Sequence, residues 1–177
     1  VSDASEEMHT SAGVVFISDQ VGYAFFIDDV GKASYKKSSD GGGTWGSVNA
    51  LTSQTDCCSI GVWYDRWTQE DSSGTTIHFS FADTGDDAIF YNYLDTSDDS
   101  TGSEVDITGD MGIYHSGDSL NPGSTKPSIT KNTDDALFVA SGGSSTQDVW
   151  ISTDNGASWD STSASWLDDE EDEYALI

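Results

Sequence analysis

Short apolar segments recur along this chain in a fixed order, and this repetition constrains the fold more than any other feature. The segments are rich in β-branched and aromatic residues, and clusters of Gly, Asp, Ser and Asn separate them. Runs of this length between turn residues are typical of β-strands. Four segments make a unit, and the three units comprise 13–17, 22–27, 33–38 and 45–51; then 59–64, 76–81, 88–94 and 104–107; then 127–130, 136–140, 148–152 and 159 onward.

The repeat predicts an all-β chain of three four-stranded units. Equivalent turn aspartates, Asp40, Asp95 and Asp154, recur at intervals of roughly 55 to 60 residues. One four-stranded unit cannot bury both of its faces alone, so units stacked side by side predict blades of a β-propeller. The predicted boundaries are blade 1 at 1–56, blade 2 at 57–126 with a long loop at 109–126, and blade 3 at 127–177 with the start of a further blade.

Two turns between third and fourth strands share one eight-residue pattern, S-x-D-x-G-x-[ST]-W. The matching residues are Ser38, Asp40, Gly42, Thr44 and Trp45 in 38–45, and Ser152, Asp154, Gly156, Ser158 and Trp159 in 152–159. The Asp can accept backbone N–H groups to close the turn, Gly supplies positive φ, and Trp offers a large apolar face. The pattern therefore predicts a structural role. The turn 95–102 keeps the Asp without the Trp, and we interpret it as a degenerate copy.

The repeated turn resembles the Asp box, or BNR repeat, of sialidase-like β-propellers. The resemblance implies a propeller whose boxes lie at the blade periphery, away from the ligand face. The segments 62–68, 77–81 and 90–96 also look like sialidase-like repeat proteins of viral and environmental sequences. Three blades do not close a ring, so we expect further blades in the same chain or in identical copies.

The basic residues are too few for the chemistry that the resemblance would otherwise imply. Sialidases of this family bind the substrate carboxylate with three arginines, because bidentate charge-assisted bonds suit a carboxylate. This chain has one arginine, Arg66, and its 6 Lys+Arg against 32 Asp+Glu give a formal net charge of −26. Such a field repels an anionic sugar and disfavours duplex nucleic acid and anionic bilayers. The sequence therefore disfavours an active sialidase and leans against an enzyme.

The candidate ligand-binding residues are Trp63, Tyr64, Arg66, Trp67 and Tyr114. Exposed aromatic rings stack on the apolar faces of sugars. The alternative is structural, with the tryptophans in blade packing and Arg66 in a salt bridge or stacked on Trp63 or Trp67. His78, in an alternating strand, is predicted to pack between strands, and His115 has no partner at metal-ligand spacing.

We expect a non-enzymatic extracellular or virion-surface recognition module that binds a glycan or host surface, an expectation that rests on fold analogy. Two alternatives stay open: a glycoside hydrolase using two carboxylates, and a purely structural component of a viral or surface-layer assembly. No catalytic residue is singled out. A catalytic acid needs burial to raise its pKa, whereas most aspartates here lie in Gly/Ser turns.

The acidic residues and the cysteines each leave two interpretations open. The acidic surface is suited to high salt, where counterions screen self-repulsion, or it provides Ca²⁺ sites, although no segment has D-x-D-x-D-G spacing. Cys57 and Cys58 are adjacent and are either small buried apolar residues or a vicinal disulfide of unusual geometry. No apolar run approaches the length of a transmembrane helix.

Overall fold

The computed structural model describes residues 12–108, 126–142 and 147–162, and this part of the chain is all-β apart from one short 3₁₀ helix, η1 (Asp65–Trp67). The first sheet contains β1 (Gly13–Phe16), β2 (Gly22–Ile27), β3 (Ala33–Ser38) and β4 (Asn49–Ala50). The middle sheet contains β5 (Cys57–Tyr64), β6 (Thr76–Asp83), β7 (Ala88–Asp95) and β8 (Ser100–Thr101), and β9 (Val105–Asp106) also pairs with β7. The third sheet contains β10 (Ser128–Lys131), β11 (Leu137–Gly142), β12 (Gln147–Ser152) and β13 (Asp160–Thr162).

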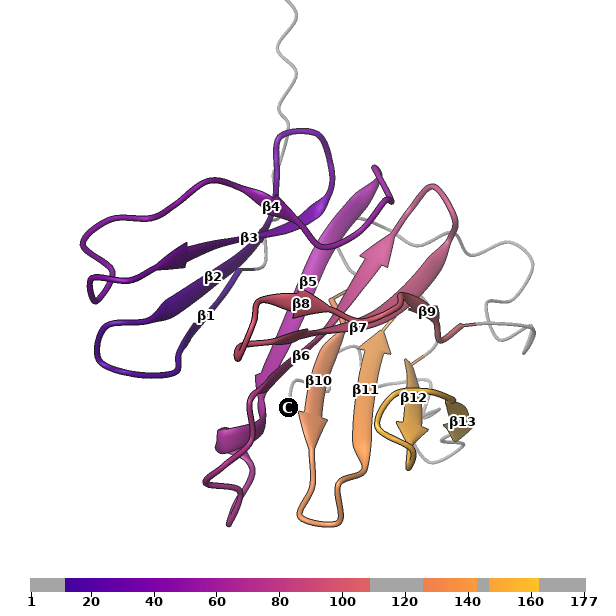
Figure 1. Ribbon diagram of the computed structural model, residues 1–177. Coiled ribbons are helices and arrows are strands. Elements are labelled where there is room, and N and C mark those ends of the chain that lie inside the picture. The colour runs from indigo at the N-terminus through magenta and orange to yellow at the C-terminus, as the bar shows by residue number, and fades with distance from the viewer. Residues whose placement is uncertain (1–11, 109–125, 143–146, 163–177) are drawn as a thin grey trace, which may run out of the picture.

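The sheets follow one another in chain order, and the middle sheet lies between the other two (Figure 1). Consecutive strands are antiparallel neighbours within each sheet, because short turns join antiparallel strands. The prediction of an all-β chain with three such units is confirmed. In the described ranges, no helix is long and apolar enough to cross a membrane.

The fourth strands are shorter than the sequence predicted. In the first unit we expected a strand over 45–51, and only β4 forms. The box tryptophan precedes the strand, since Gly46 N–H already bonds to the Lys37 carbonyl at 2.9 Å as the turn closes. In the middle sheet, β8 and β9 take the place of one strand at 104–107. These outer segments are rich in Gly, Ser and Asp, which contribute little cross-strand packing.

Both faces of the middle sheet are buried. Side chains alternate along β6, so Ile77, Phe79 and Phe81 pack against the first sheet, while Ala82 packs toward the third. Both sheets that form a core contribute large aromatic rings to it. In the first core, the ring centroids of Phe25 of the first sheet and Phe79 of the middle sheet are 6.1 Å apart. Apolar burial on both sides therefore fixes the order of the three sheets.

The adjacent cysteines lie in different cores. Cys57 is buried between the first and middle sheets, and Cys58 packs toward the third. Both thiols are free, because consecutive side chains of a strand point in opposite directions. The structure thus has no vicinal disulfide at this site. Burial raises the pKa of the Cys57 thiol to about 12, which suppresses the reactive thiolate.

The two box turns have the same internal hydrogen bonds. In the first, Ser38 Oγ donates to Asp40 at 2.8 Å, and Gly42 N–H donates to Ser38 Oγ at 2.9 Å. The Thr44 hydroxyl and N–H donate to Asp40 at 2.6 and 2.8 Å. The second box repeats these bonds with Ser152, Asp154, Gly156 and Ser158. Donors from residue 44 or 158 and from the box serine hold the pKa of each box aspartate at about 2.

The box glycines allow a test of packing between sheets, because they share a backbone conformation but not an environment. Gly156 and Gly42 have φ of 87° and 89°. A Cβ at 156 would lie 2.1 Å from Tyr91 Cε1 of the middle sheet, whereas one at 42 would lie 3.3 Å from the ring end of Phe16. We expect Gly42→Ala to lower the free energy of unfolding by about 1 kcal/mol, mainly through positive φ, because the end of the Phe16 ring needs to shift only slightly. Gly156→Ala should lower the free energy of unfolding by about 3 kcal/mol, because the clash with Tyr91 adds to the same backbone strain.

Urea unfolding of the two variants and the wild type measures this difference. Equal losses for both substitutions would show that the box turn of the third sheet does not depend on Tyr91 for its packing.

Candidate functional site

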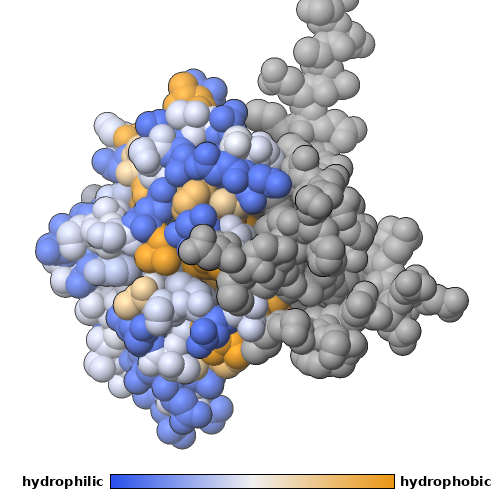
Figure 2. Space-filling model, turned by 90° about the vertical axis from the view of Figure 1, so that its right-hand side faces the viewer, coloured by the Kyte–Doolittle hydropathy of each residue, from blue (hydrophilic) through white to orange (hydrophobic). Residues whose placement is uncertain are grey.

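A polar hollow of about 470 Å³ lies where the middle and third sheets meet. Three segments form its walls: η1 with the loop that follows it, the β10–β11 turn, and the box turn between β12 and β13. The residues that matter for its chemistry are Asp65, Asp71, Gly74, Lys131, Asp135 and Asp154. The visible described surface is also largely hydrophilic, with small apolar patches (Figure 2).

Lys131 lies among three carboxylates of this hollow. Its Nζ is 2.9 Å from Asp65, 3.1 Å from Asp135 and 3.6 Å from Asp71, and its side chain is only 8% exposed. Burial opposes the ammonium charge, but the hydrogen bonds to Asp65 and Asp135 outweigh it and raise the pKa of Lys131. The lysine therefore stays charged and connects β10 of the third sheet to η1 of the middle sheet.

Asp65 also anchors a buried chain of hydrogen bonds. His78 Nε2 lies 3.0 Å from Asp65 Oδ1, and His78 Nδ1 lies 2.8 Å from the Tyr91 hydroxyl. Burial opposes ionisation of Asp65, but bonds from His78, Lys131 and the Thr76 N–H hold its pKa well below the ordinary range. Burial raises the pKa of Tyr91. The chain runs inward from Asp65 at the hollow, and His78 and Tyr91 are fully buried between strands.

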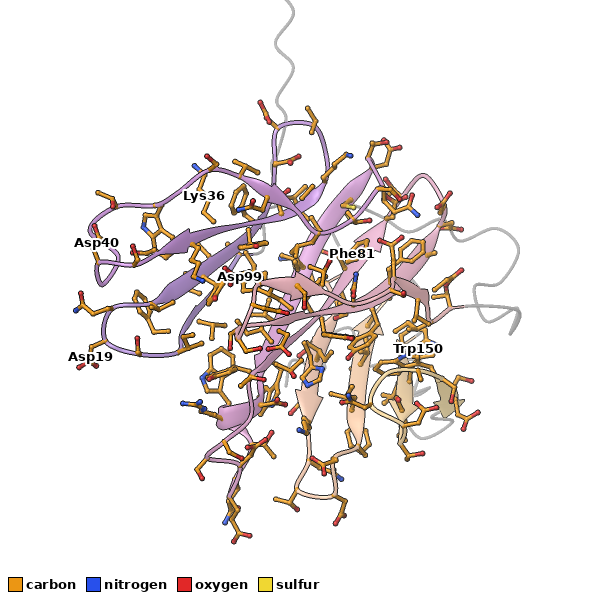
Figure 3. All side chains as sticks on the ribbon, in the orientation of Figure 1. Asp19, Lys36, Asp40, Phe81, Asp99 and Trp150 are labelled. Carbon is orange, nitrogen blue, oxygen red and sulfur yellow. The ribbon has the colours of Figure 1, made fainter. Side chains whose placement is uncertain are left out.

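The box turn of the third sheet packs onto the end of this chain. The ring of Trp159 lies 5.0 Å from that of Tyr91, and Trp159 Nε1 donates to the Gly156 carbonyl at 3.2 Å. The degenerate turn of the middle sheet makes a different connection through Asp99 (Figure 3). Asp99 accepts hydrogen bonds from the Tyr23 hydroxyl and from Lys37 Nζ of the first sheet, each at 2.6 Å. Each turn thus reaches the sheet that precedes it.

An exposed aromatic ring lies in the 3₁₀ helix that contains Asp65. Trp67, in η1, is 45% exposed. Trp63 and Tyr64 contact it edge-on, with ring centroids 5.8 and 6.4 Å away. Arg66 lies over the Tyr64 ring at 5.7 Å, and its Nε donates to the carbonyl of Gly74, which lines the hollow. The segment that contains the exposed ring is therefore linked to the wall of the hollow through Arg66 and Gly74.

The structure brings four of the five sequence candidates together at the end of β5. Trp67 and Arg66 are exposed, Trp63 is half-buried and Tyr64 is buried. Tyr114, like His115, lies outside the described residues.

Sequence reasoning missed Lys131 and its carboxylate partners. The available signal was composition: in a chain with so few cations, a lysine at the end of a predicted strand will find an acidic partner. Which of the 32 acids it meets depends on tertiary contacts.

The described carboxylates bear on two further chemistries, metal binding and acid catalysis. Within the described ranges, no three His, Cys, Asp or Glu side chains are arranged to hold a metal ion. The calcium alternative stays a prediction. The carboxyl pKa values that shift all move downward, which opposes proton donation near neutral pH; they belong to Asp28, Asp40, Asp65, Asp95, Asp98 and Asp154.

Comparisons with known proteins give no family and five matching chains of solved structures, including the two that follow. No family model matches the chain, and no curated protein matches it. The two solved structures are of an ulvan lyase of polysaccharide lyase family PL25, one bound to -[GlcA(1-4)Rha3S]- and one without it. Their sequence identities are 13% and 14%, and both have a TM-score of 0.48. The match covers 85% of this chain but 42% of theirs, so this chain spans less than half their length.

Asp65→Asn tests the buried network through its pH dependence. An Asp whose pKa is depressed by folding stabilises the protein above its unfolded pKa of about 3.9, and this contribution disappears as pH falls through the folded pKa. At pH 7 we expect a loss of about 3 kcal/mol, because an ionic partner is removed from a buried cluster. The difference in free energy of unfolding between wild type and Asp65→Asn should become smaller below pH 4.

Urea unfolding of wild type and Asp65→Asn at pH 7, 5 and 3 measures this difference at each pH. The control is Asp134→Asn, an exposed neighbour of the cluster, which should match wild type throughout. A gap that stays constant from pH 7 to 3 would contradict the assignment of ionised Asp65 to this network.

Proposed function

We propose that this chain is a non-enzymatic recognition module that binds a glycan at Trp67 and the adjoining hollow, on a cell or virion surface. The observation that carries the proposal is one exposed tryptophan in the same short 3₁₀ helix as Asp65, which lines a polar hollow. Sugars combine an apolar ring face with a rim of hydroxyl groups, so a site for them needs both an aromatic surface and hydrogen-bonding groups.

Trp67 has the fixed orientation that stacking needs. Its edge contacts with Trp63 and Tyr64 restrict the ring, and Trp63 is itself held by a bond from Nε1 to Thr68 Oγ1 at 3.0 Å. A ring ordered before binding loses less conformational entropy when a ligand arrives. The fixed ring of Trp67 therefore suits a ligand with a flat, partly apolar face.

The hollow supports the polar half of the proposal. Its volume of about 470 Å³ falls within the roughly 300–1,000 Å³ of small-ligand sites. Ser73 and Thr76 supply hydroxyl groups, and Asp71, Asp135 and Asn155 supply further polar groups along its wall. Carboxylate and amide oxygens accept bonds from sugar hydroxyls.

The same groups favour binding over hydrolysis. A glycosidase needs one carboxyl that is protonated near neutral pH, and the shift at Asp65 is in the opposite direction. His78 and Tyr91, which continue the hydrogen-bond chain from Asp65, are buried and do not line the hollow.

The proposal includes a finer description of the fold, namely three adjoining blades of a sialidase-like β-propeller. Two features support it: the sheets follow one another in chain order, and each later turn packs on the sheet before it, through Asp99 and through Trp159. In that arrangement neighbouring blades share a core, as the three sheets do here.

Trp67→Ala tests the glycan site. Removing the ring should weaken binding of the best neutral oligosaccharide by about 10- to 100-fold, because stacking at an exposed ring contributes on the order of 1.5–3 kcal/mol. Trp67→Phe should retain part of the affinity. Isothermal titration against ligands chosen from a glycan array measures both, beside an assay for released reducing ends.

Val30→Ala is the matched control, since Val30 is 60% exposed on a turn of the first sheet and should leave affinity unchanged. An array with no bound glycan would reject the proposal, and reducing ends released by wild type would replace it with a hydrolase.

A further inference from the structure

One face of the first sheet is covered, and the other is not. Val15 and Phe25 point toward the middle sheet and are fully buried. On the opposite face, Val14 is 52% exposed, Phe16 45% and the box residue Trp45 37%. A sheet with apolar side chains on both faces is suited to burial on both sides.

The strand register identifies what such a face does elsewhere in this molecule. Ser38 pairs with Gly22, and the equivalent box residue Ser152 pairs with Leu137. The Ser152 face of the third sheet, which includes Leu137 and Trp150, packs onto the middle sheet. The Ser38 face is its counterpart, and among the described residues no sheet lies against it.

The box tryptophans show the same difference. Trp159 is partly buried because its ring packs 5.0 Å from Tyr91 of the preceding sheet. Trp45 contacts Phe16 of its own sheet edge-on at 6.4 Å and remains exposed. The open face thus lacks the neighbour that the equivalent face has.

A positive charge lies in this open face. Lys36 pairs with Ala24, which pairs with Val14, and it occupies the position that Trp150 has in the third sheet. Within the described ranges Lys36 forms no ion pair, in contrast to Lys37 beside it, which pairs with Asp99 (Figure 3). A partner with apolar side chains and a carboxylate would complement this face.

The outward face of the third sheet has that composition. Phe138 pairs with Ile151, and Ile151 pairs with Asp160. The two apolar side chains are half-buried, and Asp160 is exposed. We infer that the open face of the first sheet docks on the outward face of the third sheet of a second copy, with Lys36 opposite Asp160.

This contact joins unlike faces, and among the described residues each copy has one face of each kind that no sheet covers. Two copies related by a two-fold axis make the contact twice and close a ring of sheets. The ring would give Trp45 the neighbour that Trp159 already has.

Sedimentation equilibrium of the full chain tests the inference at protein concentrations from about 1 to 500 μM, in 0.15 M and 1 M NaCl. Each copy has a formal charge of −26, so higher salt should strengthen association by screening repulsion. We expect a dimer at 1 M NaCl. A monomer at every concentration and both salts, or open polymers in place of a closed pair, would overturn the inference.

Two substitutions distinguish unlike faces from like faces. Phe16→Asp and Ile151→Asp should each weaken the dimer by at least about 100-fold, because each buries an unpaired charge. A mixture of the two variants should associate again, since one intact pair of faces remains between them. If Ile151→Asp still forms the wild-type dimer, the open faces meet each other, and the inference is wrong.

Charge reversal at the surface tests the proposed pairing of Lys36 with Asp160, and a variant at an exposed turn is the control. Lys36→Glu should weaken the dimer, and combining it with Asp160→Lys should restore it; failure of the pair to restore association would contradict the proposed pairing. Val30→Asp, at an exposed turn position, should leave the dimer intact. Unchanged circular dichroism spectra establish that each variant is folded.

Discussion

Both faces of the middle sheet carry apolar side chains that must be buried, and the rest of the structure depends on this constraint. Phe79 and Phe81 project to one side of β6, and Ala82 projects to the other into a core that also holds Ile89 and Trp150. A sheet of this kind is stable only between two others, so the middle sheet is not an independent domain. The short fourth strands fit the same principle, because they lie at the periphery where burial is least.

Polar groups at the two interfaces determine how the sheets are aligned. On one side Asp99 receives bonds from Tyr23 and Lys37, and on the other Asp65 receives them from Lys131 and His78. Buried ionic groups add little net stability, but they penalise every arrangement that leaves them unpaired. This applies to Lys131 and Asp65, whose side chains are each 8% exposed, and not to Lys37 and Asp99, which are about one-third exposed.

Much of the architecture could be predicted from the sequence because it depends on local patterns. Period-two runs located the inner strands, and the repeated box located two turns whose internal bonds involve only neighbouring residues. The pairing of Lys131 with Asp65 and the reach of Asp99 could not be predicted, since they join residues more than sixty positions apart. The candidate site was partly predictable: its aromatic residues cluster in one segment, whereas the hollow beside them needs turns from two sheets.

The positions of Cys57 and Cys58 have a consequence for following this protein in solution. Each thiol lies in a different core, so each is shielded by a different pair of sheets. Alkylation at Cys57 would record separation of the first sheet from the middle one, and alkylation at Cys58 would record departure of the third. Two adjacent residues thus act as independent internal sensors, and their relative labelling rates reveal which sheet detaches first.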